Sequence, residues 1–174
     1  MAGSLIKIDE EIVTSAVASV TLGGTDWDSS YDVYMVKYNN VVPSTDGQVL
    51  KLRVTTSGTP DSDSQYDDAI MFMKSDGAFS KTSGTNQDHF PFDTSGTATG
   101  EELDGILYLF NFNNSSEYSF ATVEGVSLNS SSALRSETGG FVHTVGEAND
   151  GVSFFFNSGN IASGQFVLYG LKKD

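Results

Sequence analysis

Two histidines, His89 and His143, are the side chains of this sequence that could act as the base of a hydrolase triad, and the sequence contains no cysteine. His143 alternates with apolar residues in GFVHTV (140–145), which is typical of an ordinary strand residue. Neither histidine lies in a nucleophile motif such as G-x-S-x-G. Two histidines without cysteine also make a poor zinc set. The histidines therefore predict neither a hydrolase nor a zinc protein.

Carboxylates are concentrated in TPDSDSQYDD (59–68), which offers enough hard oxygen ligands for Ca²⁺ in Asp61, Asp63, Asp67 and Asp68. The spacing departs from the EF-hand loop, which needs glycine at its sixth position and glutamate at its twelfth. A solvated acidic loop is the favoured interpretation, with these aspartates as the alternative metal ligands. The sequence predicts no cofactor.

A glycosidase would need two carboxylates about 5 to 10 Å apart, and the segment Glu101–Asp104 could supply such a pair. Acidic residues occur along the whole chain, so many other pairs could be nominated equally well. This pattern favours a protein that binds without catalysing a reaction.

The elements that must position these side chains are predicted to be strands, because apolar and polar residues alternate with a period of two. In QVLKLRV (48–54), Leu50, Leu52 and Val54 alternate with Lys51 and Arg53. No segment keeps a helical stripe across three turns. The prediction is a single domain over residues 1–174, an all-β antiparallel β-sandwich that is jelly-roll-like. Other predicted strands are 12–22, 31–38, 69–75, 106–112, 118–128, 140–145, 152–158 and 165–171.

Two connections, 80–100 and 129–140, are predicted to be long loops, and loops of this length in compact domains are usually functional. The first contains His89, Phe90 and Phe92, which could anchor a partner surface. The favoured alternative is that both phenylalanines fold back into the core of their own domain. Residues 1–8, with Leu5 and Ile6, are expected to form either an N-terminal arm or the first strand.

The net charge of −14 argues against direct binding to nucleic acid or to anionic lipid. No apolar run approaches the roughly 20 residues that a membrane-spanning helix needs. Hydrophobic residues make up 38% of the chain, which is enough to build a core. The expected partners are neutral, basic or bridged by cations.

Four segments carry a resemblance that spans nearly the whole chain: SLIKI, DSSYDVYMVKYNNVVPSTDG with LKLRVTTSG, GILYLFNFNNSSEYSF, and SFFFNSGNIASGQFVLYGL. In these segments the sequence resembles a module of virion proteins from tailed bacteriophages, notably phages of marine cyanobacteria and other marine bacteria. The resemblance implies a structural, non-enzymatic virion component. It transfers no functional residue, because the shared segments are predicted scaffold strands and turns.

Fibre proteins with such a module usually carry a shaft ahead of it, whereas Met1 stands only a few residues before the module here. We therefore expect a capsid decoration or cement protein on the outer surface of the phage head, as a homotrimer bound to the major capsid protein. Its contacts would come from SLIKI or from the 80–100 connection. The alternative is a tail-fibre or receptor-binding tip that holds a host surface glycan with Phe90 and Tyr118.

Overall fold

The computed structural model describes residues 4–128 and 133–172. Within these ranges the chain forms antiparallel strands, and no helix there is long and apolar enough to cross a membrane. The all-β class and the antiparallel pairing predicted from the sequence are thus confirmed. In chain order the strands are β1 (Leu5–Val13), β2 (Val20–Gly23), β3 (Tyr31–Pro43), β4 (Gln48–Thr56), β5 (Thr59–Pro60), β6 (Tyr66–Lys74), β7 (Phe79–Gln87), β8 (Phe90–Ser95), β9 (Leu103–Phe110), β10 (Ser119–Leu128), β11 (Leu134–His143), β12 (Gly151–Phe156) and β13 (Ile161–Lys172).

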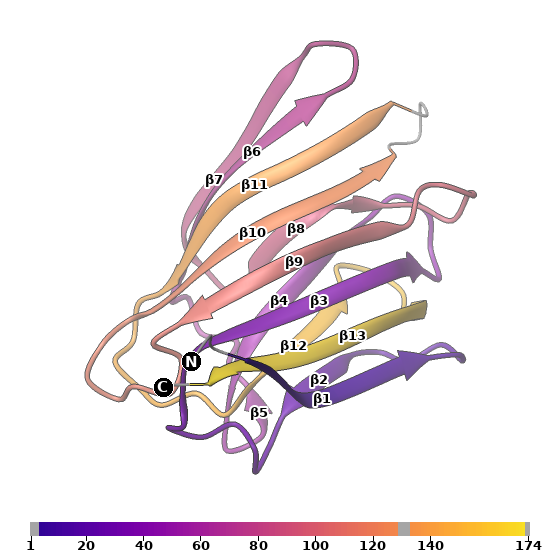
Figure 1. The fold of residues 1–174 in the computed structure, drawn as a ribbon. Coiled ribbons are helices and arrows are strands. Elements are labelled where there is room, and N and C mark those ends of the chain that lie inside the picture. Colours follow the sequence, from indigo (N-terminus) through magenta and orange to yellow (C-terminus); the bar gives the residue numbers. More distant parts are fainter. Residues whose placement is uncertain (1–3, 129–132, 173–174) are drawn as a thin grey trace.

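The described strands form two sheets (Figure 1). The large sheet has the order β1-β13-β3-β9-β10-β11-β6-β7, so that β1 and β7 are its edge strands. The small sheet has the order β2-β12-β4-β5, and β8 pairs with β4. Both ends of the described chain lie in the large sheet, because Leu5 of β1 pairs with Leu171 of β13.

Alternation explains how the large sheet buries one face. Along β10, every second residue from Ser119 to Ser127 is buried, and the residues between them are exposed. Successive side chains of a strand point to opposite faces, so this pattern places one face of β10 in the core and the other in solvent. The inner face of β10 therefore carries Ala121 and Val123, and its outer face carries Phe120, Thr122 and Glu124.

Aromatic side chains fill the space between the inner faces of the two sheets. The rings of Phe90 on β8 and Phe141 on β11 stack with centroids 4.8 Å apart. Phe154 of β12 contacts Phe166 of β13 at 5.0 Å between centroids. Each pair joins the small sheet to the large one. Burial of such aromatic area is the main source of stability for a chain without disulfides.

The prediction of one strand over 12–22 is wrong. β1 ends at Val13 in the large sheet and β2 begins at Val20 in the small sheet. The chain must leave one sheet for the other between these two buried valines, which alternation alone does not reveal. Residues 5–8 belong to β1, so this part of the N-terminal segment forms the first strand and not a separate arm. Met1–Gly3 lie outside the described residues.

The prediction of a long loop over 80–100 is also wrong, because most of this segment belongs to β7 and β8. β7 is an edge strand with largely exposed side chains on both faces, so its sequence is not constrained to alternate. In β8, Pro91 removes a backbone donor and so weakens the strand signal. The prediction of a second long loop over 129–140 is wrong over 134–140, because these residues belong to β11; residues 129–132 lie outside the described residues.

Candidate functional site

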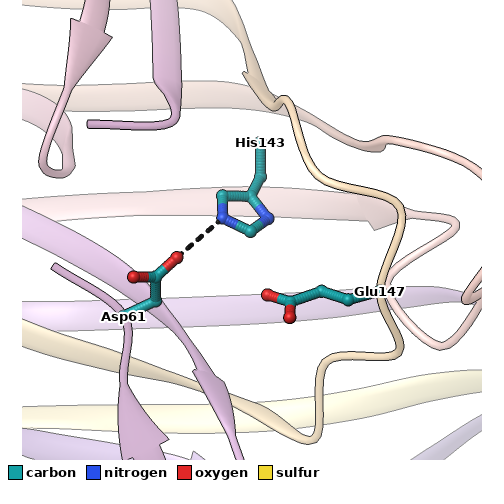
Figure 2. Close-up of side chains that lie close together, drawn as sticks. All are labelled: Asp61, His143 and Glu147. Carbon is teal, nitrogen blue, oxygen red and sulfur yellow. Dashed lines mark hydrogen bonds and ion pairs between the residues drawn. The ribbon is translucent and has the colours of Figure 1, made fainter. Parts of the chain in front are cut away.

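Asp61, His143 and Glu147 converge at one end of β11, and we call these three residues the open cluster (Figure 2). His143 is the last residue of β11 and its side chain is fully buried. Its Nε2–H donates to Oδ2 of Asp61 at 3.0 Å. One ligand atom from each of the three residues lies within 4.8 Å of the other two. The open cluster combines an imidazole with two carboxylates.

Asp61 is held firmly in the open cluster by its backbone. Its N–H donates to the carbonyl of Val54 (2.9 Å), and its carbonyl accepts from the hydroxyl of Tyr66 (2.9 Å). The second carboxylate oxygen, Oδ1, accepts from the N–H of Asp63 (2.8 Å). Asp61 is therefore positioned by β4, by β6 and by its own turn.

Two polar groups of the open cluster lack partners among the described residues. Nδ1 of His143 is buried and accepts or donates no hydrogen bond there. The Glu147 carboxylate makes no hydrogen bond or ion pair with the described part of the chain, nor does a lysine or arginine pair with Asp61. A surface pocket of about 390 Å³ reaches the cluster and is lined by Asp61, Asp63 and Glu147 among others.

The structure does not assemble the calcium ligands considered from the sequence. Asp63 lines the same pocket as Asp61 but is exposed and lies outside the open cluster. Asp67 lies on β6, where its Oδ1 accepts from the N–H of Asn86 at 2.8 Å. Asp68 is the next residue of the same strand and is buried. Because neighbours in a strand face opposite sides, Asp67 and Asp68 cannot converge on one ion.

A second polar cluster lies further along the inner face of β11, and we call it the closed cluster: Tyr38, Asp93, Ser127, Arg135 and Glu137. The guanidinium of Arg135 pairs with Oδ1 of Asp93 at 2.9 Å. Ser127 donates to Oδ2 of Asp93 (3.3 Å), and Tyr38 donates to Oε1 of Glu137 (3.2 Å). Here a cation within the chain balances the buried carboxylate of Asp93.

Two glycines make room for the contact between Tyr38 on β3 and Glu137 on β11. Gly105 of β9 and Gly125 of β10 lie between these residues in the same row of the sheet. A Cβ on Gly105 would lie 2.2 Å from the Tyr38 hydroxyl, and one on Gly125 would lie 2.5 Å from Oε1 of Glu137. The absence of side chains at both positions lets the two long side chains meet across two strands.

Burial changes the protonation of the closed cluster. Desolvation, followed by the charge of Asp93, raises the pKa of Glu137 to about 8. Burial also raises the pKa of Asp93, whereas its hydrogen bonds and Arg135 act in the opposite direction. We place the proton on Glu137, because Arg135 pairs directly with Asp93. Near pH 7 the cluster therefore holds one ion pair and one neutral acid.

The opposite side of the large sheet faces away from the small sheet, and we call it the outer face. Strand pairing places apolar residues side by side across it, in the row Leu5, Leu171, Val33, Phe110, Phe120 and Val142. Tyr108 and Met71 lie in neighbouring rows and are also exposed. A contiguous apolar surface of this kind is typical of an interaction site.

The outer face is hollowed between β9, β10, β11, β6 and β7. The hollow has a volume of about 730 Å³, and Tyr108, Thr122, Thr138, Met71 and Lys81 are among the residues that line it. An adjoining depression reaches Phe120 and Gly140. A Cβ added to Gly140 would meet no atom closer than 3.7 Å, so this glycine leaves open space.

The charges on the outer face nearly balance, although the chain as a whole carries −14. By strand register, three lysines and four carboxylates belong to this side of the sheet, namely Lys7, Lys37, Lys81, Glu10, Asp67, Asp104 and Glu124. An acidic or neutral partner would therefore meet less repulsion here than over the rest of the surface.

The interaction residues proposed from the sequence differ in whether the structure exposes them. Phe90 and Phe92 are buried at 0% and 2% exposure, so their interpretation as loop anchors is wrong and the favoured core alternative holds. His89 is half-buried, with Nδ1 bound to Asp88, which also pairs with Arg53. Leu5 and Ile6 are exposed on the edge strand β1, at 51% and 39%. Burial of Phe90 also removes it from the glycan-binding alternative.

The glycosidase candidates serve local structure. Oδ1 of Asp104 accepts from the backbone N–H of Asn40 at 2.8 Å and from the Asn39 amide at 3.1 Å. Oε2 of Glu101 accepts from the N–H of Ala98 at 3.2 Å. Asp104 thus satisfies a backbone donor where the pairing of β3 and β9 is irregular, and Glu101 satisfies one in the connection before β9.

Sequence reasoning missed Glu147 and the outer-face aromatics Tyr108 and Phe120. Glu147 lies in GEANDG, a segment whose glycines, asparagine and aspartate are typical of a turn, and nothing in that segment indicates that it approaches Asp61. The sequence does carry a signal for the outer face, because residues 106–110 of β9 (ILYLF) are apolar at consecutive positions rather than at alternate ones. A strand apolar on both faces in a sheet that is covered on one side predicts an exposed apolar surface.

Comparison with known proteins identifies no relative: no family model, no curated protein and no solved structure matches the chain.

Proposed function

We propose that this protein is a non-enzymatic structural protein of a phage virion. Within that class we propose a decoration or cement protein that packs on the major capsid protein at the outer surface of the head. The setting comes from the resemblance of the sequence to phage virion modules. The observation that carries the binding role is the exposed apolar outer face of the large sheet.

The outer face suits attachment to a protein surface. Stable protein interfaces have an apolar core with aromatic residues and few charges at the centre, and Tyr108, Phe110 and Phe120 occupy the middle strands of this face. Its nearly balanced charge lowers the repulsion that the acidic chain would otherwise meet. The remaining acidic surface would keep decorated particles from associating.

The two segments expected to make contacts, SLIKI and 80–100, contribute the two edge strands of the large sheet, β1 and β7. An edge strand has free backbone donors and acceptors, which can pair with a strand of a partner. This arrangement supports attachment by edge pairing alongside burial of the outer face. Assembly as a homotrimer belongs to the same proposal, as does the finer classification of the fold as a jelly-roll-like β-sandwich.

A pair of threonines provides a matched test of the outer face. Thr122 lies at its centre and Thr21 lies on β2 of the small sheet, and both are exposed strand residues. Thr122→Asp should abolish co-sedimentation of the purified protein with undecorated phage heads, because it introduces a charge into the buried interface. Thr21→Asp should bind as the unmodified protein does. Equal binding by both variants would overturn the outer face as the attachment surface.

A receptor-binding tip is the second candidate, favoured by the composition of the hollow. Tyr108 offers an aromatic ring on which a sugar could stack, and Thr122, Thr138 and Ser83 offer hydroxyls beside it. Tyr108→Ala should then abolish binding to host cells. Binding to cells without binding to heads would reject the decoration role, and binding to heads alone would reject the receptor role.

A further inference from the structure

We propose that Asp61, His143 and Glu147 form a binding site for a divalent transition-metal ion of the Zn²⁺ class. The proposal rests on the convergence of three ligand-bearing side chains, one of them a fully buried imidazole, and on a pocket that opens Asp61 and Glu147 to solvent. It is independent of the outer face, which lies on the other side of the large sheet.

The geometry is close to that of a metal site. Nε2 of His143 and Oδ2 of Asp61 are 3.0 Å apart, about the separation of two adjacent ligands that each lie roughly 2.0 to 2.2 Å from one ion. Glu147 is partly exposed and makes no hydrogen bond to another described residue, so its carboxylate is free to complete the set. The remaining coordination positions would face the pocket and take water.

The chemistry of the ligands selects the class of metal. Imidazole nitrogen together with carboxylate oxygen suits Zn²⁺ and its neighbours, whereas Ca²⁺ and Mg²⁺ prefer oxygen ligands alone. The chain supplies two carboxylates here and no lysine or arginine pairs with them among the described residues. A bound cation would balance these charges.

The metal would bind Nε2 of His143, the ring nitrogen that faces Asp61. It would replace the proton on Nε2, which would move to Nδ1, and it would join His143 to Asp61 directly. Nδ1, which has no hydrogen-bond partner among the described residues, lies on the other side of the ring and would stay outside the coordination sphere.

The site would join parts of the fold that are distant in sequence. Asp61 follows β5 of the small sheet, His143 ends β11 of the large sheet, and Glu147 lies in the connection to β12. A metal bound to all three would cross-link the two sheets at one end. This role is the one that disulfides often fill, and the chain has no cysteine.

Binding is tested by titrating the chelator-treated full chain with Zn²⁺ in a calorimeter. We expect saturation at one equivalent and a rise in melting temperature. Glu147→Gln should weaken binding at least about tenfold, as loss of a metal-site residue does. Asp63→Asn is the matched control, because Asp63 lines the same pocket outside the cluster, and it should change affinity less than about twofold. Equal weakening by both variants, or no saturation, would overturn the site.

The role of the imidazole is tested by nitrogen NMR, since the sequence has two histidines. Zn²⁺ should shift the ring signals of His143 and leave those of His89 in place, with His89→Gln used to assign them. Ca²⁺ at the same concentration should shift neither. A Zn²⁺ shift confined to His89, or Ca²⁺ competing equally with Zn²⁺, would overturn the proposal, and neither result would affect the tests of the outer face.

Discussion

β11 carries one polar cluster toward each end of its inner face, and the two clusters balance charge in different ways. In the closed cluster, Arg135 pairs with Asp93 and a proton neutralises Glu137. In the open cluster, Asp61 and Glu147 have no such cation among the described residues. The closed cluster lies between the sheets, whereas the open cluster adjoins a surface pocket.

Acidic groups at the inner face of the large sheet can thus be neutralised in two ways. A group sealed from solvent must find its counter-charge or proton within the chain, because an unpaired buried charge is strongly unfavourable. A group beside a pocket can obtain the counter-charge from solution. We therefore expect substitutions in the closed cluster to change stability and substitutions in the open cluster to change ligand binding.

The largest expected effect comes from Arg135→Met. It leaves Asp93 buried without its cation and should lower the free energy of unfolding by about 3 to 5 kcal/mol, measured by urea denaturation. Adding Asp93→Asn to this variant should restore part of the loss, because the uncompensated charge is then gone. A double variant as unstable as the single one would show that the ion pair is not the cause.

The second effect is a pH dependence of stability that Glu137→Gln removes. The folded pKa of Glu137 is raised to about 8 from an ordinary value near 4.5, so the folded chain holds more protons between these values. The contribution of Glu137 to stability is therefore fully present below about pH 4.5 and is lost as the pH rises to about 8, by up to about 1.4 kcal/mol per pH unit. The difference between Glu137→Gln and the unmodified chain should grow with pH; a constant difference would contradict the assignment.

Gly105→Ala should have a smaller effect, about 1 to 3 kcal/mol, because its Cβ would overlap the ring of Tyr38. Gly140→Ala is the control, since it adds a methyl group to open space in the same sheet. Thermal denaturation of both variants would measure the two losses of stability. Similar losses would indicate that general strand effects, rather than the space needed by Tyr38, explain the glycine.

The smallest effect is expected for Glu147→Gln in metal-free protein, within about 0.5 kcal/mol of the unmodified chain by urea denaturation, because Glu147 makes no ion pair or hydrogen bond to the other described residues. A loss above about 2 kcal/mol would show that the open cluster is a structural network like the closed one.

Much of the fold could be predicted from the sequence because alternation is a local property. The predicted segment 48–54 lies within β4, the segment 118–128 coincides with β10 except for its first residue, and the absence of a helical stripe indicated the right class. The errors at β7 and β8 arose where the local pattern fails, in an edge strand exposed on both faces and in a strand that contains Pro91. The partition of 12–22 between two sheets depends on packing, which alternation does not encode.

The composition of the candidate sites depends on tertiary structure more than the positions of the strands do. The sequence by itself determined the acidic charge, the absence of cysteine, the strand pattern and Asp61 as a possible metal ligand. Only the tertiary structure decided that Asp61 meets His143 and Glu147, that Phe90 and Phe92 are core residues, and that the aromatics of β9 and β10 share an exposed face. The physical reason is that alternation fixes which side of a strand a residue occupies, while the order of strands and the packing of the sheets fix its neighbours.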